Sequence, residues 1–192
     1  MKTQQKAKDI LFPVPAALVV SGVGDDANII TVAWIGIVGS NPPALGISLH
    51  KNRYTLLLIR ETQEFTANIP RQSDFAKVDY CGIVSGKTLN KFNATNFTKM
   101  DGCKVNVPII KECPLNIECR VLREVDLQDW ILIIGEILEV NLDADCLDED
   151  GKVAIKKVDP LIYIPTIREY WNIAEKLADS FNVGKDYKKS IE

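Results

Sequence analysis

The 192-residue chain is 46% hydrophobic and 26% charged, which is typical of a single folded domain over residues 1–192 and leaves too little length for two. The net charge of −3 comes without a basic block, so we expect no nucleic-acid partner. No segment reaches the ~20 apolar residues of a membrane helix and the N-terminus lacks a signal-peptide core, which predicts no membrane partner and a cytoplasmic location.

Three short apolar runs open the chain, at residues 16–21, 29–37 and 44–49. Turn-forming segments rich in Gly, Asp, Asn and Pro separate them, at residues 22–26 and 39–43. Tight turns join antiparallel neighbours, whereas parallel strands need a long crossover connection. The beginning of the chain therefore predicts an antiparallel meander or barrel.

A short helix is predicted directly after Asn52, with an apolar run at residues 56–59. A strand is predicted at residues 64–69. The polar stretch 71–81 places three apolar side chains at helical spacing. Residues 85–97 are rich in Ser, Asn, Thr and Lys, which predicts an irregular or partly helical excursion of the kind that often carries functional residues.

Two longer strands are predicted in the second half of the chain. Residues 115–121 alternate apolar and polar side chains with a period of two. The apolar run 130–140 has Gly135 near its centre, which predicts a bulge or bend of the kind that closes a barrel. Residues 124–129 between the two strands predict a hairpin turn.

The C-terminal part begins with an acidic loop at residues 143–151 and continues through a short apolar run that ends at residues 160–164. Residues 169–178 predict a terminal helix. With about six or seven strands and a few short helices, the predicted fold class is mainly β with helical insertions, an antiparallel barrel.

The sequence around the first predicted helix indicates an anion site. Arg53 and Thr55 stand where that helix begins, and the unpaired amides and the helix dipole favour negative charge at this end. An arginine fork and a threonine hydroxyl would suit a phosphate group. The alternative is an ordinary helix cap, formed by Asn52 or Thr55, beside a surface arginine.

Other common catalytic and metal-binding patterns are missing from the sequence. His50 is the single histidine, which excludes zinc sites built on two or more histidines. The five cysteines form no C-x-x-C pair and are odd in number, so a reducing compartment, buried thiols and no metal site are expected. Neither a Walker loop nor a G-x-G-x-x-G turn is present. We therefore expect no catalytic side chain and infer that a bound group carries any chemistry.

Several short motifs occur in a fixed order along the chain, from about Phe12 to Trp171. They are P-x-P-A-A-L-V-V from Pro13, N-x-x-T-V-A-W from Asn28, N-P-P from Asn41, R-x-T from Arg53, E-F-x-x-N-I-P from Glu64, S-G-K from Ser85, N-K-F from Asn90, C-P-L-N-I-E-C from Cys113, G-E-I from Gly135 and P-L-I-Y from Pro160. In this order they resemble the flavin reductase-like family, which includes flavoredoxin and whose members bind FMN on a split β-barrel.

The resemblance implies a homodimer with FMN near the subunit interface. It also implies a redox function, and the first expectation is reduction of flavin or a ferric chelate by NADH or NADPH. One alternative is a flavoredoxin-like electron carrier that takes electrons from a redox partner protein without using NAD(P)H. Another is a binding module that keeps the barrel and has lost the flavin.

The resemblance further implies which residues hold FMN. The phosphate is assigned to Arg53 and Thr55, with His50, Lys51 and Asn52 nearby. The flavin ring and its polar edge are assigned to the second strand, at Thr31, Val32, Ala33 and Trp34. The remaining expected contacts are Ser48, Asn68, Ser85, Gly86, Lys91, Phe92 and Tyr163.

Some of these assignments have plain structural alternatives. Trp34 could be core packing, Lys91 a solvated lysine and Asn68 part of a turn. Tyr170, which the predicted terminal helix would carry, competes with Tyr163 as the residue that covers the ring. Cys81 is expected to be an inert thiol.

Overall fold

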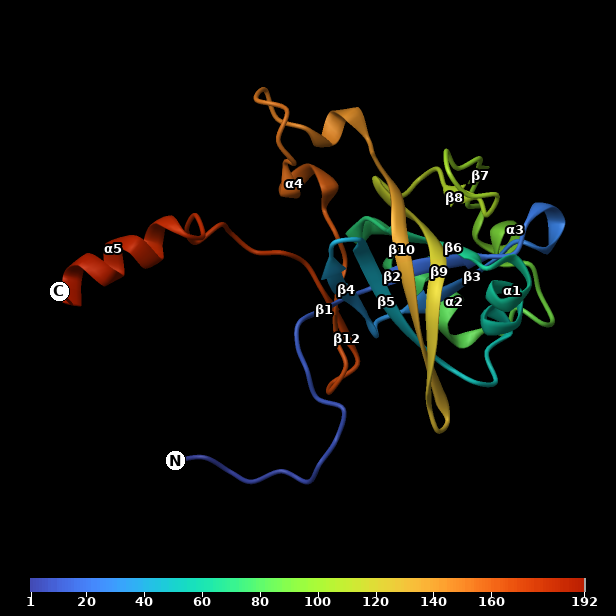
Figure 1. The fold of residues 1–192 in the computed structure, drawn as a ribbon, viewed down its shortest axis with the longest axis horizontal. Helices are drawn as coiled ribbons and strands as arrows, with labels where there is room; N and C mark the ends of the chain where they lie inside the picture. Colours follow the sequence, from blue (N-terminus) through green and yellow to red (C-terminus); the bar gives the residue numbers. More distant parts are fainter. Residues whose placement is uncertain (192) are drawn as a thin grey trace.

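A seven-stranded antiparallel sheet forms the centre of the protein in the computed structural model, which describes residues 1–191 (Figure 1). Its strand order is β3-β2-β6-β9-β10-β5-β4. The strands are β2 (Ala17–Ser21), β3 (Asn28–Val32), β4 (Ile35–Ser40), β5 (Pro43–His50), β6 (Glu64–Ile69), β9 (Leu115–Leu127) and β10 (Trp130–Leu142). This arrangement confirms the predicted fold class, mainly β and antiparallel.

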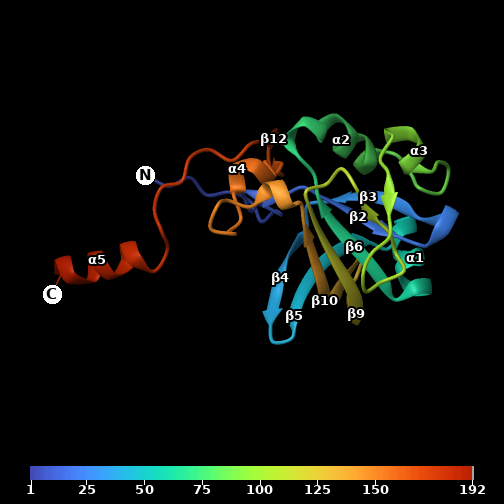
Figure 2. The ribbon, with the colours of Figure 1, turned by 90° about the horizontal axis from the view of Figure 1, so that it is seen from above.

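Two smaller sheets and several short helices complete the fold (Figure 2). The small sheets are β1 (Val14–Pro15) with β11 (Ile162–Ile164) and β12 (Glu169–Trp171), and β7 (Lys99–Met100) with β8 (Ile109–Ile110). The α-helices are α1 (Tyr54–Thr62), α2 (Phe75–Ile83), α3 (Lys91–Thr95), α4 (Ile155–Val158) and α5 (Asn182–Ile191), and the 3-10 turns are η1 (Gly24–Asp26), η2 (Gln72–Asp74) and η3 (Ala144–Cys146). None of the described helices has the length and apolar character needed to cross a bilayer.

Strand β2 is buried along its whole length because both of its faces are covered. Leu18 and Val20 belong to an apolar cluster that includes Val78 of α2 and Phe92 of α3. Val19, between them, belongs to a second cluster that α1 and the long strands complete. A strand covered on both faces has no polar alternation, which explains its continuous apolar sequence.

Three predicted boundaries are wrong. Residues 29–37 form two strands, since β3 ends at Val32 and β4 starts at Ile35. The hairpin turn expected at 124–129 is present but occupies only residues 128–129, because β9 continues to Leu127. The acidic side chains of Glu124 and Asp126 near this strand end pair with Arg60 and Lys51. These exposed ion pairs make the strand end look like a polar turn in the sequence.

The terminal helix predicted at 169–178 is the third wrong boundary. Residues Glu169–Trp171 form β12, and residues 172–179 have no regular structure. Tyr170 of β12 lies opposite Tyr163 of β11, with the ring centroids 5.3 Å apart. Cross-strand aromatic packing therefore overrides the helical spacing of this segment.

Gly135 confirms the predicted irregularity in β10, because the register with β9 shifts between Ile134 and Gly135. A methyl group at position 135 would lie 2.7 Å from the Phe65 ring and 3.0 Å from Cys119 Cβ. Only a residue without a side chain leaves room for the Phe65 ring against β10.

A fully buried carboxylate, Glu118 of β9, fixes the loop that precedes β8. Its two oxygens accept hydrogen bonds from the amides of Cys103 at 2.8 Å, Lys104 at 2.7 Å and Val105 at 3.1 Å. The Asn141 side chain donates a fourth bond at 2.7 Å. Burial acts to raise the pKa of Glu118, but these hydrogen bonds outweigh it and hold the pKa below its ordinary value.

We predict that Glu118→Gln lowers the free energy of unfolding by roughly 2 kcal/mol or more, because the amide cannot accept all of these bonds. The matched control is Glu124→Gln on the same strand, whose exposed pair with Arg60 should contribute less than about 1 kcal/mol. Equilibrium unfolding in urea measures the free energy of unfolding of both variants and of the wild type.

The same substitution has a pH signature. A carboxyl with a depressed folded pKa stabilises the fold above its unfolded pKa and loses that effect as the pH falls through the folded value. The gap between wild type and Glu118→Gln should therefore be full above about pH 5 and shrink under more acidic conditions. A gap that does not change with pH would contradict an ionised Glu118.

Candidate functional site

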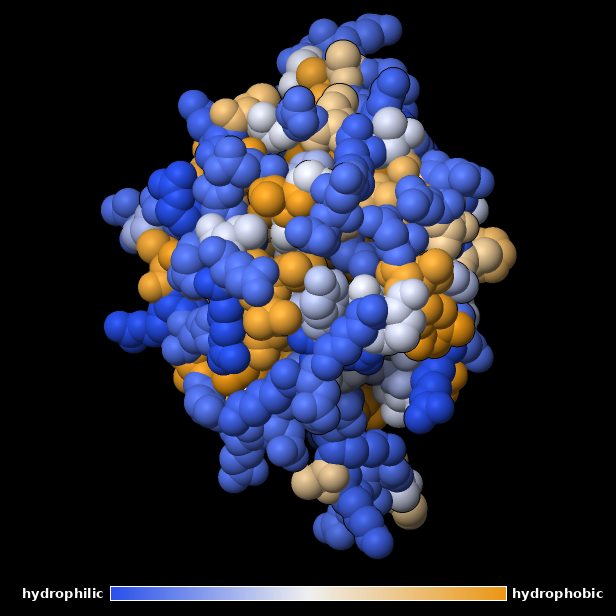
Figure 3. Space-filling view, turned by 90° about the vertical axis from the view of Figure 1, so that its right-hand side faces the viewer, coloured by the Kyte–Doolittle hydropathy of each residue, from blue (hydrophilic) through white to orange (hydrophobic). Residues whose placement is uncertain are grey.

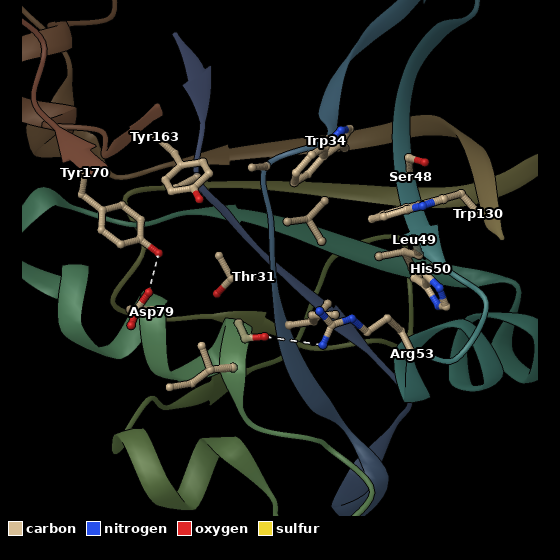
Figure 4. Close-up of a pocket in the computed structure, with 16 residues that line it drawn as sticks. Thr31, Trp34, Ser48, Leu49, His50, Arg53, Asp79, Trp130, Tyr163 and Tyr170 are labelled. Atoms are coloured by element: carbon tan, nitrogen blue, oxygen red, sulfur yellow. Dashed lines mark hydrogen bonds between the residues drawn. The ribbon is translucent and has the colours of Figure 1, made fainter. Parts of the chain in front are cut away.

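One cavity of about 250 Å³ gathers side chains from separate parts of the chain (Figure 4). It lies where the β3–β4 junction, the end of β5, the start of α1, the last turn of α2 and the β11–β12 hairpin meet. The lining residues are Ala16, Ile30, Thr31, Val32, Ala33, Trp34, Ser48, Leu49, His50, Arg53, Asp79, Gly82, Ile83, Trp130, Tyr163 and Tyr170.

The backbone at the break between β3 and β4 lines part of this cavity. Ala33 and Trp34 lie outside both strands, and only the Trp34 carbonyl keeps a ladder bond, from the Ser48 amide at 2.9 Å. Among residues 1–191, no hydrogen bond is found from the amides of Ala33 or Trp34. These two donors are therefore available to a bound molecule.

Arg53 supplies the cavity's cationic side chain. It is the residue immediately before α1, in an extended conformation, and its side chain makes no capping hydrogen bond. Within the described chain its guanidinium makes one long hydrogen bond, 3.5 Å to the Gly82 carbonyl, and no ion pair. Most of its donors are free to bind an anion, and the start of α1 adds positive potential.

Lys91 lies behind the cavity wall and is only 2% exposed. Its Nζ donates to the Cys81 carbonyl at 2.6 Å, in the last turn of α2. Burial lowers the pKa of Lys91 to about 8, with nearby Arg53 adding to the effect and Cys81 opposing it. Burial likewise raises the pKa of Cys81 to about 11, so its thiol is protonated at neutral pH.

Aromatic rings flank both sides of the cavity. Trp34 and Trp130 lie with ring centroids 5.8 Å apart, and His50 meets Trp130 edge-on at 5.6 Å. On the other side stand Tyr163 and Tyr170 (Figure 4). Such walls suit a flat, apolar ligand.

Tyr170 is also anchored to α2. Its hydroxyl donates to Asp79 Oδ1 at 3.2 Å. Burial, followed by the charge of Asp79 and this hydrogen bond, raises the pKa of Tyr170 above its ordinary value. The hydroxyl is thus a fixed donor and not a titrating group at neutral pH.

Half of the residues predicted to contact FMN line this cavity. They are Thr31, Val32, Ala33, Trp34, Ser48, His50, Arg53 and Tyr163. Trp34 is 44% exposed, so it does not belong to the core as its structural alternative supposed. The Thr31 hydroxyl donates to the Val78 carbonyl of α2, so this hydroxyl is already engaged within the protein.

The other predicted residues do not line the cavity. They are Lys51, Asn52, Thr55, Asn68, Ser85, Gly86, Lys91 and Phe92. Lys51 pairs with Asp126, and Phe92 packs in the core. Asn68 is buried, donates to the Leu18 carbonyl and accepts from the Ile110 amide, so it is part of the core and not of a turn.

The sequence prediction missed the contribution of α2 and of Trp130. Asp79, Gly82 and Ile83 are spaced by three and four residues, so they share one helix face that the helical pattern could have revealed. Trp130 lies opposite His50 in the β5–β10 pairing. That register depends on the fold of the whole sheet and has no local signal.

A second cluster brings the ligand atoms of Asp143, Asp145 and Cys146 within 4.8 Å of one another. The Arg71 guanidinium contacts both Asp143, at 3.5 Å, and the sulfur of Cys146, at 3.8 Å. The arginine supplies positive charge here, so this cluster is a structural ion pair.

Comparison with known proteins gives a consistent result. The model of the flavin reductase-like domain matches residues 10–171. A flavoredoxin of Desulfovibrio vulgaris (Miyazaki F) is 37% identical, with a TM-score of 0.91 and coverage of 96% of this chain and 100% of that one. A flavoredoxin of Methanosarcina acetivorans is 31% identical, with a TM-score of 0.90 and coverage of 97% and 100%.

A structure from Shewanella frigidimarina with a split-barrel domain is similar in fold. Its identity is 24%, its TM-score 0.77, and the match covers 87% of this chain and 85% of that one. The likeness supports the split-barrel architecture alone.

We predict that the Lys91 amine titrates near pH 8, whereas exposed lysines titrate near their ordinary ~10.4. In protein carrying 13Cε-labelled lysine, the Lys91 resonance would be assigned by its loss in Lys91→Met and followed by NMR against pH. A midpoint above pH 10 would contradict the desolvated position of Nζ.

Proposed function

This chain belongs to the flavin reductase-like family, and we propose that it is an FMN-dependent electron carrier of the flavoredoxin type. The observation that carries the proposal is the guanidinium of Arg53. It has no ion pair within the described chain, and it faces a cavity with aromatic walls at the start of a helix.

The residues of the cavity fit the parts of FMN. Arg53 and the first amides of α1 would hold the phosphate, since both favour a dianion. The amides of Ala33 and Trp34 would bond the polar edge of the flavin ring, and the aromatic side chains would flank its apolar part. When bound, FMN supplies the capacity to accept and release electrons.

The protein itself would then bind FMN, orient it and determine the electrostatic potential around it. Arg53 lines the cavity and Lys91 stands behind its wall, so the local potential is positive. A positive potential favours a group that gains negative charge on reduction. Asp79 is the single carboxylate in the lining, and Tyr170 holds it in place.

The charge of the lining favours a carrier over a nicotinamide-dependent reductase. Arg53 and His50 are the basic residues among those that line the cavity. With Arg53 engaged by the flavin phosphate, His50 alone remains for the pyrophosphate of NADH or NADPH. We infer that electrons come from a redox partner protein.

We predict that Arg53→Ala weakens FMN binding by about 10-fold or more, as expected for a charged contact of roughly 1.5–3 kcal/mol. Quenching of flavin fluorescence during titration measures the affinity. Arg60→Ala is the matched control on the same helix, because Arg60 pairs with Glu124 and does not line the cavity. Equal affinity in Arg53→Ala and wild type would remove Arg53 from the site, and a protein that never binds FMN would favour a flavin-free binding module.

The electron donor is tested by anaerobic absorption spectroscopy of the flavin-loaded protein. We expect NADH and NADPH to bleach the flavin band slowly, over many minutes, whereas dithionite bleaches it at once. Bleaching by either nucleotide within seconds would overturn the carrier assignment and favour an NAD(P)H-dependent reductase.

A further inference from the structure

Lys91 is a buried cation that does not line the cavity. It belongs to α3, and the face of the protein that carries α1 and α3 is covered mainly by polar side chains, with apolar ones scattered among them (Figure 3). Water is therefore close, yet the Lys91 side chain is only 2% exposed and its Nζ donates inward, to the Cys81 carbonyl at 2.6 Å. Burying an ammonium group costs free energy unless an opposite charge offsets the lost hydration.

Within the described part of the chain, no carboxylate supplies that opposite charge. None of the ion pairs found there includes Lys91. The Cys81 thiol acts on Lys91 from α2, but burial raises the pKa of this thiol to about 11, so it is uncharged at neutral pH. The carbonyl that Nζ contacts carries only a partial charge. The protein on its own therefore holds an ammonium group without an anionic partner.

A second cation lies beside the first. The Arg53 guanidinium donates to the Gly82 carbonyl at 3.5 Å, which is the next carbonyl along α2 from the one that Lys91 binds. Two positive charges thus meet neighbouring carbonyls at the end of α2, and the charge of Arg53 disfavours the protonated form of Lys91. A group that neutralises Arg53 must therefore make it easier for Lys91 to hold its proton.

The other elements around α3 do not change this balance. Strand β3 faces α3 with Asn28, a neutral residue whose side-chain oxygen accepts from the Lys91 amide at 3.1 Å. Strand β7 brings a further cation, Lys99, whose Nζ lies 5.3 Å from the centroid of the Phe92 ring. The turn η1 meets the start of α3 through the backbone carbonyl of Asp25, and Asp25 itself is exposed.

Asp79 is the single carboxylate in the cavity lining. Its Oδ1 accepts from the Tyr170 hydroxyl at 3.2 Å, and Figure 4 shows it at the opposite end of the cavity from Arg53. The end of the cavity beside Arg53 and Lys91 therefore keeps a positive potential for a bound anion.

We propose that Lys91 takes up a proton as a phosphate dianion binds beside Arg53, and that this proton strengthens the preference of the site for a doubly charged phosphate. The bound dianion offsets the charge of Arg53 and attracts the ammonium form of Lys91, so both effects act in the same direction. The amine gains one proton from the solvent, and no other bond is made or broken. Lys91 acts through the cavity wall, so it determines specificity and is not a catalytic residue. That the phosphate is the one of FMN rests on the proposed function.

The direction of the pH effect follows from the titration of Lys91. Burial lowers the pKa of Lys91 to about 8 in the free protein, whereas a bound dianion raises it again. Below about pH 7 the amine is protonated in both states, so its titration does not affect the affinity. As the pH rises through about 8, the free protein loses the proton and must recover it on binding. The affinity for the dianion therefore falls in this range.

Isothermal titration calorimetry counts the protons that are taken up with FMN. The full chain is titrated at about pH 8.5 in two phosphate-free buffers that differ in ionisation enthalpy. We expect wild type to take up at least roughly 0.3 proton more per FMN than Lys91→Met, because contributions from other groups, such as His50, are common to both proteins and cancel. Lys99→Met, the matched control beside α3, should behave as wild type does.

Equal proton uptake in wild type and Lys91→Met would overturn the proposal. Lys91→Arg provides the same comparison where Lys91→Met does not fold, since its guanidinium stays charged throughout this pH range and has no proton to gain.

NMR of protein carrying 13Cε-labelled lysine follows the same proton directly in wild type. We expect the midpoint of the Lys91 titration to rise by about 0.5 pH unit or more with FMN, and likewise with saturating inorganic phosphate. Riboflavin, which has the flavin ring without the phosphate, should leave the midpoint unchanged. A midpoint that FMN does not move, or one that riboflavin raises as far as FMN does, would also overturn the proposal.

The two probes separate this inference from the proposed function. FMN that binds without proton uptake and without moving the Lys91 midpoint would sink the inference and leave the proposed function intact. A protein that does not bind FMN, but whose Lys91 midpoint still rises with inorganic phosphate, would do the reverse.

Discussion

The C-terminal half of α2, from residue 78 to residue 83, is the point on which the site depends. Three side chains from three other elements donate to its carbonyls: Thr31 of β3 to Val78, Lys91 of α3 to Cys81, and Arg53 at the start of α1 to Gly82. The carboxyl end of a helix is partly negative, so two cations and a hydroxyl find favourable partners there. These contacts hold α2 against the sheet and place Gly82 and Ile83 in the cavity wall.

The same arrangement explains why positive charge gathers beside the cavity. Lys91 is buried at a cost that lowers its pKa, and the carbonyl of Cys81 offsets part of that cost. The hydrogen bond from the Arg53 guanidinium to the Gly82 carbonyl is long, at 3.5 Å. Most donors of this guanidinium therefore remain unused. One cation is therefore structural and the other is available to a ligand, although both meet the same helix end.

The sequence predicts most of the strands and the position of the first helix well, because local signals carry them. Arg53 follows an apolar strand and opens a helix, and both features are visible in a few residues. The break at Ala33 and Trp34 has no such signal, since the apolar run continues across it. The burial of Lys91 also has no local signal. It lies in a polar segment, where a solvated lysine would be expected, and the fold leaves it only 2% exposed. Tyr170 was expected on a helix and lies on β12, where its partner Tyr163 comes from a separate strand.

Gly135 sets a limit on how this chain can change. The space that a methyl group would need at position 135 is already filled by the Phe65 ring of a different strand. A larger residue at 135 therefore requires a smaller residue at position 65, and it must also displace Cβ of Cys119, which would lie 3.0 Å away. Evolutionary drift at positions 65 and 135, seventy residues apart, is thus coupled through the steric contact between them.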